Sequence, residues 1–235
     1  MEDNYKEKYF NFPIQLVEGF MEDSKLVLNN ISDYGIYLMS LNYEFGEEEE
    51  ERMASAFKFF NLEKKNVWKT HERGKNLYDS LEMKSPMVGI KMEIFWDYYK
   101  NPKTDFQKAT LLAHLAIRSI LKDKSYCKIT NLYLWSRMDG KTHAVDDKWE
   151  LSPSIRKFTN HYQTRKLKNE LKDNWFLIEY SRRTRGWFVS YKMSLTDLIF
   201  YVEKRKKKNR DEKRKQDEKE AYDQAMRRLK NDYDF

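Results

Sequence analysis

The sequence holds very little cysteine, proline and glycine. Its 235 residues include one cysteine, four prolines and seven glycines, where average usage would give about 12 prolines and about 16 glycines. A single thiol, Cys127, excludes an internal disulfide framework and makes the reducing cytoplasm the expected compartment. The scarcity of the two turn-forming residues predicts long helices and few tight turns.

Long apolar runs and catalytic motifs are missing as well. No run of about 18 apolar residues exists, which excludes a membrane span, and residues 1–8 lead into no apolar segment typical of a secretory signal. The four histidines show neither H-E-x-x-H nor H-x-H spacing, and no G-x-S-x-G, Walker or G-x-G-x-x-G motif is present. We therefore expect no catalytic residue, no cofactor and no metal site, and a protein that is not an enzyme.

Two weaker enzymatic interpretations stay open. Glu93 and Asp97 lie one helical turn apart, a pair that a metal-dependent nuclease could use, although a third ligand is lacking. Cys127 precedes Lys128, which could lower a thiol pKa, but no histidine partner is identifiable. His114 lies on an apolar helical pattern and is expected in the core or at an interface.

Charge is what the sequence has in abundance, and it is unevenly distributed. Charged residues make up 35% of the chain and the net charge is +7. Residues 1–100 hold 13 Lys/Arg against 19 Asp/Glu, whereas residues 101–235 hold 32 against 19. Such asymmetry indicates an acidic surface and a separate basic surface that binds nucleic acid. The 40% hydrophobic and 15% aromatic content excludes disorder throughout.

Apolar spacing predicts a helical first half. Pro13 and the stripe that follows it suggest a helix over 11–20, and Ser24 is a candidate cap for the next helix. Ser85-Pro86 marks a break, and the β-branched and aromatic segment 90–99 still fits helical spacing better than strand spacing. The remaining expected helices of this half cover 24–41, 47–60 and 64–83.

The second half has a more specific order. Thr104 or Asp105 caps a helix over 106–121, a shorter helix covers 128–138, and Ser152-Pro153 starts a third that breaks near Asn160. Two aromatic segments, 175–181 and 187–193, then flank a basic loop and predict a β-hairpin. Three helices followed by a hairpin is the order of a winged helix, a helix-turn-helix variant.

The predicted fold is therefore mainly α, in three regions. Residues 1–102 form an acidic helical region, and residues 103–193 form a winged-helix-like basic domain of three helices and a basic β-hairpin. Residues 194–235 form a long charged C-terminal helix or tail, which starts at Ser194.

The third helix, the hairpin loop and the start of the last helix supply the expected nucleic-acid contacts. Their side chains can neutralise phosphates or donate to base edges. Core packing is the competing role for Tyr162, Trp175 and Trp187, whose rings could otherwise stack on bases. The expected contact residues are Arg156, Lys157, Gln163, Arg165, Lys166, Lys168, Lys172, Arg182, Arg183, Arg185, Trp187, Lys204, Arg205, Lys206, Lys207 and Lys208.

Three stretches also resemble a known family. They are Asn11 to Phe20, Tyr126 to Asn131 with Ser136 to Gly140, and Tyr162 to Leu171 with Thr184 to Ser190. They resemble proteins carried by phages and mobile elements of bacteria that are similar to type VI-B anti-CRISPR proteins, inhibitors of an RNA-guided RNA-cleaving effector. The resemblance covers most of the chain and transfers no catalytic residue. It implies a non-enzymatic inhibitor, in the cytoplasm of a bacterial host cell, that binds the effector nuclease, its guide RNA, or both.

A second function class remains open. A winged-helix transcription regulator or replication factor of a mobile element would place the third helix in the major groove of duplex DNA. Sequence-specific duplex binding would favour this alternative, whereas shape-led RNA binding would favour the inhibitor.

Overall fold

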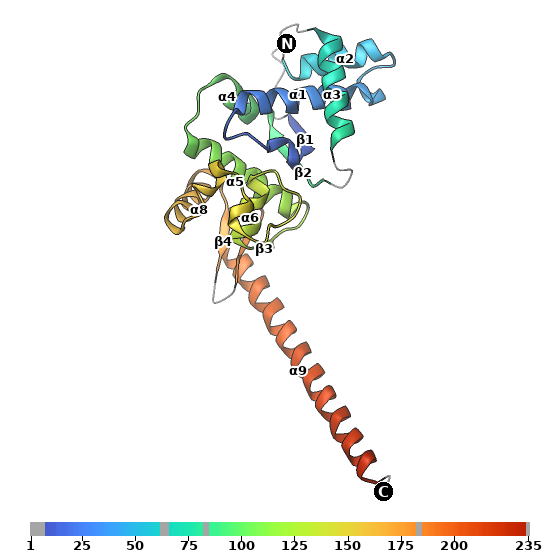
Figure 1. Ribbon diagram of the computed structural model, residues 1–235, viewed down its shortest axis with the longest axis vertical. Coiled ribbons are helices and arrows are strands. Elements are labelled where there is room, and N and C mark those ends of the chain that lie inside the picture. The colour runs from blue at the N-terminus through green and yellow to red at the C-terminus, as the bar shows by residue number, and fades with distance from the viewer. Residues whose placement is uncertain (1–7, 62–65, 82–84, 182–184, 234–235) are drawn as a thin grey trace.

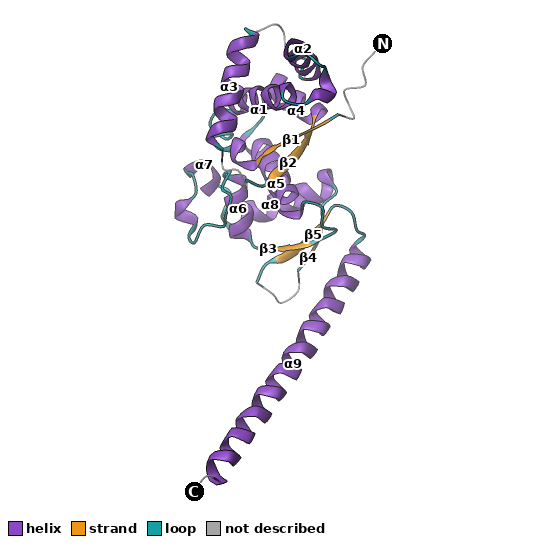
Figure 2. Cartoon of the chain, turned by 90° about the vertical axis from the view of Figure 1, so that its right-hand side faces the viewer, coloured by secondary structure: helices purple, strands orange, loops and turns teal. Residues whose placement is uncertain are grey.

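The chain is mainly helical, with two small antiparallel sheets (Figures 1 and 2). The computed structural model describes residues 8–61, 66–81, 85–181 and 185–233, and side chains as far as residue 228. The expected mainly α class is confirmed. The α-helices are α1 (Ser24–Ser40), α2 (Glu49–Phe59), α3 (Val67–Ser80), α4 (Met92–Lys100), α5 (Asp105–Leu121), α6 (Asn131–Met138), α7 (Pro153–Arg156), α8 (His161–Trp175) and α9 (Leu195–Tyr233). The strands are β1 (Tyr9–Pro13), β2 (Met87–Lys91), β3 (Cys127–Ile129), β4 (Ile178–Tyr180) and β5 (Trp187–Ser190), and short 3-10 turns cover Ile14–Val17, Tyr43–Phe45 and Lys148–Glu150.

Helix starts follow the side chains that can cap them. Thr104 and Gln107 form a reciprocal capping box at the start of α5, as Gln107 N donates to Thr104 Oγ1 at 3.3 Å. Asn160 accepts from Gln163 N at 2.8 Å, which confirms the break between α7 and α8. The cap of α1 is Asp23, not Ser24 as expected, because the Asp23 carboxylate accepts from Leu26 N.

The helix expected over 11–20 is wrong. This segment is the strand β1 followed by a 3-10 turn. Phe10 and Phe12 are buried while Tyr9 and Asn11 are more exposed, a two-residue alternation typical of a strand. β1 pairs antiparallel with β2, a partner far away in the sequence. That long-range pairing overrides the local helical pattern.

Two other expected helices begin later than their patterns suggested. The segment 90–99 splits, because residues up to Lys91 complete β2 and the helix α4 begins at Met92. The segment 128–138 splits in the same way: Cys127–Ile129 is β3, and Thr130 caps α6. In both cases a strand is followed directly by a helix. The apolar residues of the strand fit the helical spacing, so the sequence pattern predicts a helix that begins too early.

One continuous core joins the two halves. Its buried side chains come from β1, α1, α2, β2, α4, α5, β3, α6, α7, α8 and β5. The acidic region and the basic region expected on either side of residue 102 therefore contribute side chains to the same hydrophobic core. The central helix α5 supplies the middle of this core, with Leu111, Leu112 and Ile117 almost fully buried.

The second sheet has the order β3-β5-β4 and all its pairs are antiparallel (Figure 2). β5 is central: Trp187 and Val189 join the main core, while Phe188 packs against Leu198 and Val202 of α9. The Tyr180 hydroxyl donates to Glu203 at 2.8 Å on the same side. The sheet therefore anchors the first turns of α9 to the body.

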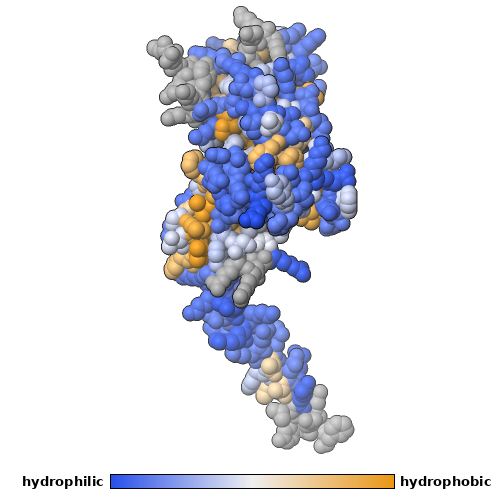
Figure 3. Space-filling model, turned by 90° about the vertical axis from the view of Figure 1, so that its left-hand side faces the viewer, coloured by the Kyte–Doolittle hydropathy of each residue, from blue (hydrophilic) through white to orange (hydrophobic). Residues whose placement is uncertain are grey.

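Helix α9 runs for 39 residues, or about 58 Å at the usual rise. Ser194 caps it as expected, accepting from Asp197 N at 3.1 Å. Figure 1 shows α9 leaving the body beyond its anchor, and Figure 3 shows its shaft as almost wholly hydrophilic on the visible face. None of the helices in the described part of the chain has the length and apolarity that a bilayer crossing requires.

Candidate nucleic-acid interface

A basic stripe runs along one side of α8. His161, Arg165, Lys168 and Lys172 recur at intervals of four, three and four residues, which places them on one helical face. A neighbouring side of the helix is buried in the core through Thr164, Leu167 and Leu171. The helical period thus gives α8 two faces. One face packs against the core and holds the helix in place, and the basic stripe lies on the other.

The stripe borders a cleft of about 470 Å³. Its lining includes Asn131 at the start of α6, the stripe residues of α8, and Glu179 of β4. Lys172 Nζ lies 3.3 Å from Glu179 Oε1. Glu179 is the one carboxylate among the described lining residues, so positive charge predominates in the cleft.

Lys168 is the most enclosed cation of the stripe. Its ammonium lies over the Trp187 ring, 3.7 Å from the ring centroid. Burial lowers the pKa of Lys168 below its ordinary value, and the Lys172 charge lowers it further, while Glu179 opposes both effects. An incoming phosphate would add a favourable charge to this partly desolvated site.

Trp187 is not available for base stacking. The side chain is 2% exposed, and Lys168 covers its ring. The expectation of a nucleic-acid contact at Trp187 is therefore wrong, because this strand turns the indole toward the core. Trp175 is half-buried and its ring lies 4.4 Å from that of His114. Tyr162, by contrast, is 71% exposed and can reach a partner.

Three other expected contact residues lie away from the stripe. Lys166 lies over the ring of Phe106, 4.3 Å from its centroid. Gln163 is half-buried, about 140° around the helix from Lys168. Arg156 is half-buried over the ring of Trp149, at 5.4 Å. The adjacent Lys157 is exposed at the end of α7.

The hairpin loop is described only in part. Arg182 and Arg183 lie outside the described residues, while Arg185 is exposed. Gly186 follows with φ +91°, and a Cβ there would collide with the Ile129 carbonyl of β3. The loop therefore requires glycine at this position to re-enter the sheet beside Arg185.

The basic residues expected on α9 surround its first free turns. Lys206 is half-buried, with its ammonium 3.0 Å from Glu203 and over the rings of Tyr180 and Phe188. Lys208 pairs with Glu212 at 3.7 Å. Lys204, Arg205 and Lys207 are exposed. These basic residues lie on α9 and not on α8. The contacts between the first turns of α9 and the second sheet fix the direction of α9.

His161 and Asn131 are among the lining residues of the cleft that sequence reasoning missed. His161 lies four residues before Arg165, so the helical spacing that relates the stripe residues could have included it. Asn131 comes from α6, and its Oδ1 is buried with no hydrogen-bond partner in the described part of the chain. Only the tertiary structure, in which α6 and α8 both pack against α5, brings it to the cleft.

Of the alternative catalytic groups, Glu93 is exposed, Asp97 forms an ion pair and Cys127 packs against the core. Asp97 accepts from Lys103 at 2.6 Å, and this bond holds the pKa of the carboxyl below its usual range. Burial raises the pKa of the Cys127 thiol to about 11, which opposes formation of a thiolate nucleophile. Over the described ranges, no group of three or more metal-ligating side chains gathers.

His114 gives the protein a predicted pH dependence. Burial lowers its pKa to about 3, and Nδ1 lies 2.9 Å from the Tyr191 hydroxyl. The unfolded chain therefore binds a proton between about pH 6.5 and about pH 3 that the folded chain does not bind. The contribution of His114 to the free energy of unfolding is fully present above about pH 6.5. Lowering the pH from 7 to 5 is expected to reduce the free energy of unfolding by about 2 kcal/mol. Urea unfolding at pH 7 and at pH 5 measures this difference in stability. The substitution His114→Gln should remove most of the difference. An unchanged difference in the variant would contradict the role assigned to His114.

Comparisons of the chain with family models, with curated proteins and with solved structures found no match.

Proposed function

We propose that the segment from α5 to β5 is a winged-helix unit that binds nucleic acid through the α8 stripe. A helix (α5), a strand (β3), three further α-helices (α6, the single-turn α7 and α8) and two strands (β4 and β5) follow one another here, and the first strand joins the sheet beside the last. In helix-turn-helix proteins the later helix faces the nucleic acid, and in the winged variant the hairpin contacts the neighbouring backbone. α8 and the β4–β5 connection correspond to those two elements.

The cleft beside α8 is the observation that carries this proposal. Three cations, Arg165, Lys168 and Lys172, reach it from one face of one helix. A stripe of that length can neutralise several phosphates at once, which is the main source of nucleic-acid affinity. Arg185 of the hairpin loop and Lys204, Arg205 and Lys207 at the start of α9 are further exposed cations of the same half of the chain. No catalytic step is part of the proposal.

We infer that the nucleic acid is RNA within a ribonucleoprotein, and that the chain acts as an inhibitor. The acidic first region offers a surface that a basic nucleic-acid channel of an effector nuclease could bind, while the basic unit binds the guide RNA. The resemblance to type VI-B anti-CRISPR proteins points to the same pair of partners. The exposed Tyr162 beside the stripe supplies a ring on which an unpaired base can stack.

Duplex DNA is the second candidate, because α8 is the later helix of the proposed unit, and the later helix of a helix-turn-helix enters the major groove. In that case the chain is a DNA-binding regulator or replication factor of a mobile element. The two candidates share the contact surface and differ in the preferred nucleic acid.

A competition experiment tests both candidates. Fluorescence anisotropy would follow a labelled RNA hairpin bound to the full chain, with unlabelled duplex DNA of equal length as competitor. The titration is repeated at about 50 and about 200 mM salt, because phosphate contacts make affinity fall steeply with salt. We expect the RNA to be preferred and the affinity to fall at least tenfold at the higher salt.

Each other outcome has a defined meaning. Preference for DNA would replace the inhibitor by the DNA-binding regulator. Binding to neither would overturn the nucleic-acid function of the unit. If RNA is preferred, the chain is added to a type VI-B effector with its guide RNA, and failure to reduce target-RNA cleavage would contradict the inhibitor.

A further inference from the structure

A second cleft lies on the other side of α5, between this helix and the β1–β2 sheet. It has two lobes of about 540 and 420 Å³. Tyr9, Gly89 and Arg118 line both lobes, so we call the whole hollow the Arg118 cleft. It shares no lining residue with the cleft beside the α8 stripe.

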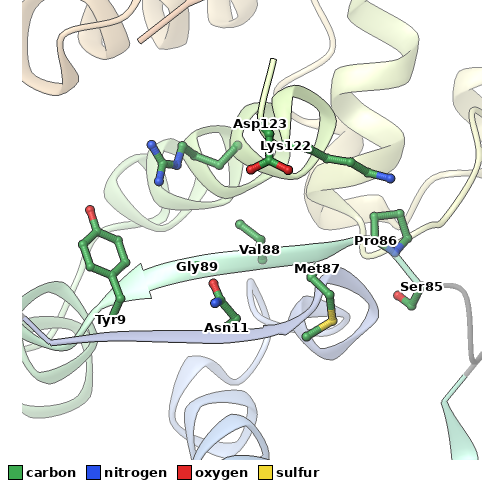
Figure 4. Close-up of a pocket in the computed structure, with 10 residues that line it drawn as sticks. Tyr9, Asn11, Ser85, Pro86, Met87, Val88, Gly89, Lys122 and Asp123 are labelled. Carbon is green, nitrogen blue, oxygen red and sulfur yellow. The ribbon is translucent and has the colours of Figure 1, made fainter. Parts of the chain in front are cut away.

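The first lobe combines polar side chains with the apolar Pro86, Met87 and Val88. Figure 4 shows Tyr9 and Asn11 rising from β1 on one side, with Lys122 and Asp123 at the end of α5 across from them. The Ser85 hydroxyl also lines this lobe and is buried without a hydrogen-bond partner among the described residues. A ligand with polar atoms would satisfy this group, which is otherwise costly to bury.

The second lobe is aromatic and aliphatic. Trp175, Phe176 and Tyr191 line it together with His114 and apolar side chains of α5 and β2. His114 is neutral near pH 7, since burial lowers its pKa to about 3, and it fixes the Tyr191 hydroxyl at 2.9 Å. Phe176 is 80% exposed, and no other role is evident for so large an apolar surface. This lobe is suited to a planar ring.

Arg118 joins the two lobes and carries an unpaired charge. It is half-buried, and its guanidinium lies 5.9 Å from the centroid of the Tyr191 ring. Among the residues that the structure describes, no carboxylate forms an ion pair with it. A partly desolvated guanidinium of this kind favours a bidentate contact with a phosphate or carboxylate.

The rim adds to the positive potential. Lys91 and Lys122 accompany Arg118, while Asp123 is the one described carboxylate in the lining. Each lobe has the volume of a small-molecule site, and an apolar wall with a few convergent polar groups is the usual composition of such sites. The size, charge and rings together define the ligand chemistry.

We propose that the Arg118 cleft binds a small aromatic anion, whose phosphate or carboxylate contacts Arg118 while its ring lies in the aromatic lobe. The site is separate from the α8 stripe, and the inference does not depend on the proposed nucleic-acid function. A free mononucleotide and an aromatic carboxylate are the two sources of this chemistry.

Isothermal titration of the full chain with AMP, indole-3-carboxylate and inorganic phosphate tests the proposal. We expect AMP, indole-3-carboxylate or both to bind more tightly than phosphate. The tighter binder of these two shows whether the site takes a mononucleotide or an aromatic carboxylate. Arg118→Met keeps the aliphatic stem and should weaken that binding at least tenfold, whereas Arg118→Lys keeps the charge without the fork and should be intermediate. No binding of either aromatic anion at millimolar concentration, or equal binding to Arg118→Met, would overturn the site.

Three further variants protect the test against misfolding and against binding elsewhere. Phe176→Asn suits the left-handed backbone at φ +57° and should weaken aromatic-anion binding several-fold without affecting phosphate. Phe200→Ala removes an exposed ring of α9 and should change nothing. Lys168→Met with Lys172→Gln should leave AMP binding intact; loss of binding there, with Arg118→Met unaffected, would place the anion on the α8 stripe and contradict the proposal.

Discussion

A triple variant of the α8 stripe, Arg165→Glu, Lys168→Met and Lys172→Gln, is expected to weaken nucleic-acid binding about 100-fold at low salt. Arg165 is exposed and tolerates reversal of its charge. Methionine at position 168 keeps the packing over Trp187. Loss of up to three phosphate contacts should also reduce the slope of log affinity against log salt by about 2 to 3. Anisotropy titrations at several salt concentrations measure both effects.

Lys166→Gln is the matched control for this variant. It removes a positive charge from the same helix, but Lys166 lies over Phe106 and away from the stripe. We expect its affinity to stay within about threefold of the unmodified chain, since a single peripheral phosphate contact contributes little. The triple variant removes four units of positive charge and the control removes one, so a control loss of more than about threefold would mean that net charge, not the stripe, determines binding.

Gly74→Ala is expected to destabilise the fold by about 2 kcal/mol and to lower Tm by about 4 to 8 °C. A Cβ at Gly74 of α3 would collide with the carbonyl group of Asp33 and approach Tyr37 Cβ of α1 to 2.8 Å. Backbone atoms cannot move aside as a flexible side chain can, so the two helices must separate. This cost exceeds the gain of about 1 kcal/mol that alanine brings to a helix.

The separation would also weaken polar contacts between α1 and α3. Arg73 donates to Asp33 at 2.8 Å, and His71 Nε2 lies 3.0 Å from Ser40 Oγ. Asn76→Ala, on the exposed side of the same helix, should instead stabilise the protein by a few tenths of a kcal/mol. Chemical denaturation of both variants checks the prediction, and an equal response at positions 74 and 76 would contradict the close packing.

Local chemistry was readable from the sequence wherever a short segment decides its own conformation. The cap at Thr104, the break near Asn160 and the cap at Ser194 were expected, and each depends on a side chain and a backbone group within one turn. The hairpin of β4 and β5 is also local, since its strands are joined by one loop. The basic character of α8 is a property of its composition.

Pairings between distant segments were not readable. β1 and β2 form one sheet although α1, α2 and α3 separate them, and β3 joins β5 across α6 and α8. A strand of three to five residues has too few positions for its period to be distinguished from a helical one. Its partner decides its conformation, and the partner is found only when the chain is folded.

The same division applies to the functional surfaces. The sequence by itself determined that the second half is basic, that α8 carries cations and that a hairpin follows it. Only the tertiary structure decided that Arg165, Lys168 and Lys172 share a cleft, that Trp187 turns inward, and that Arg118 lies between two lobes without an ion-pair partner among the described residues. Composition and helical period are properties of neighbouring residues, whereas burial and cleft shape arise from side chains that meet across the core.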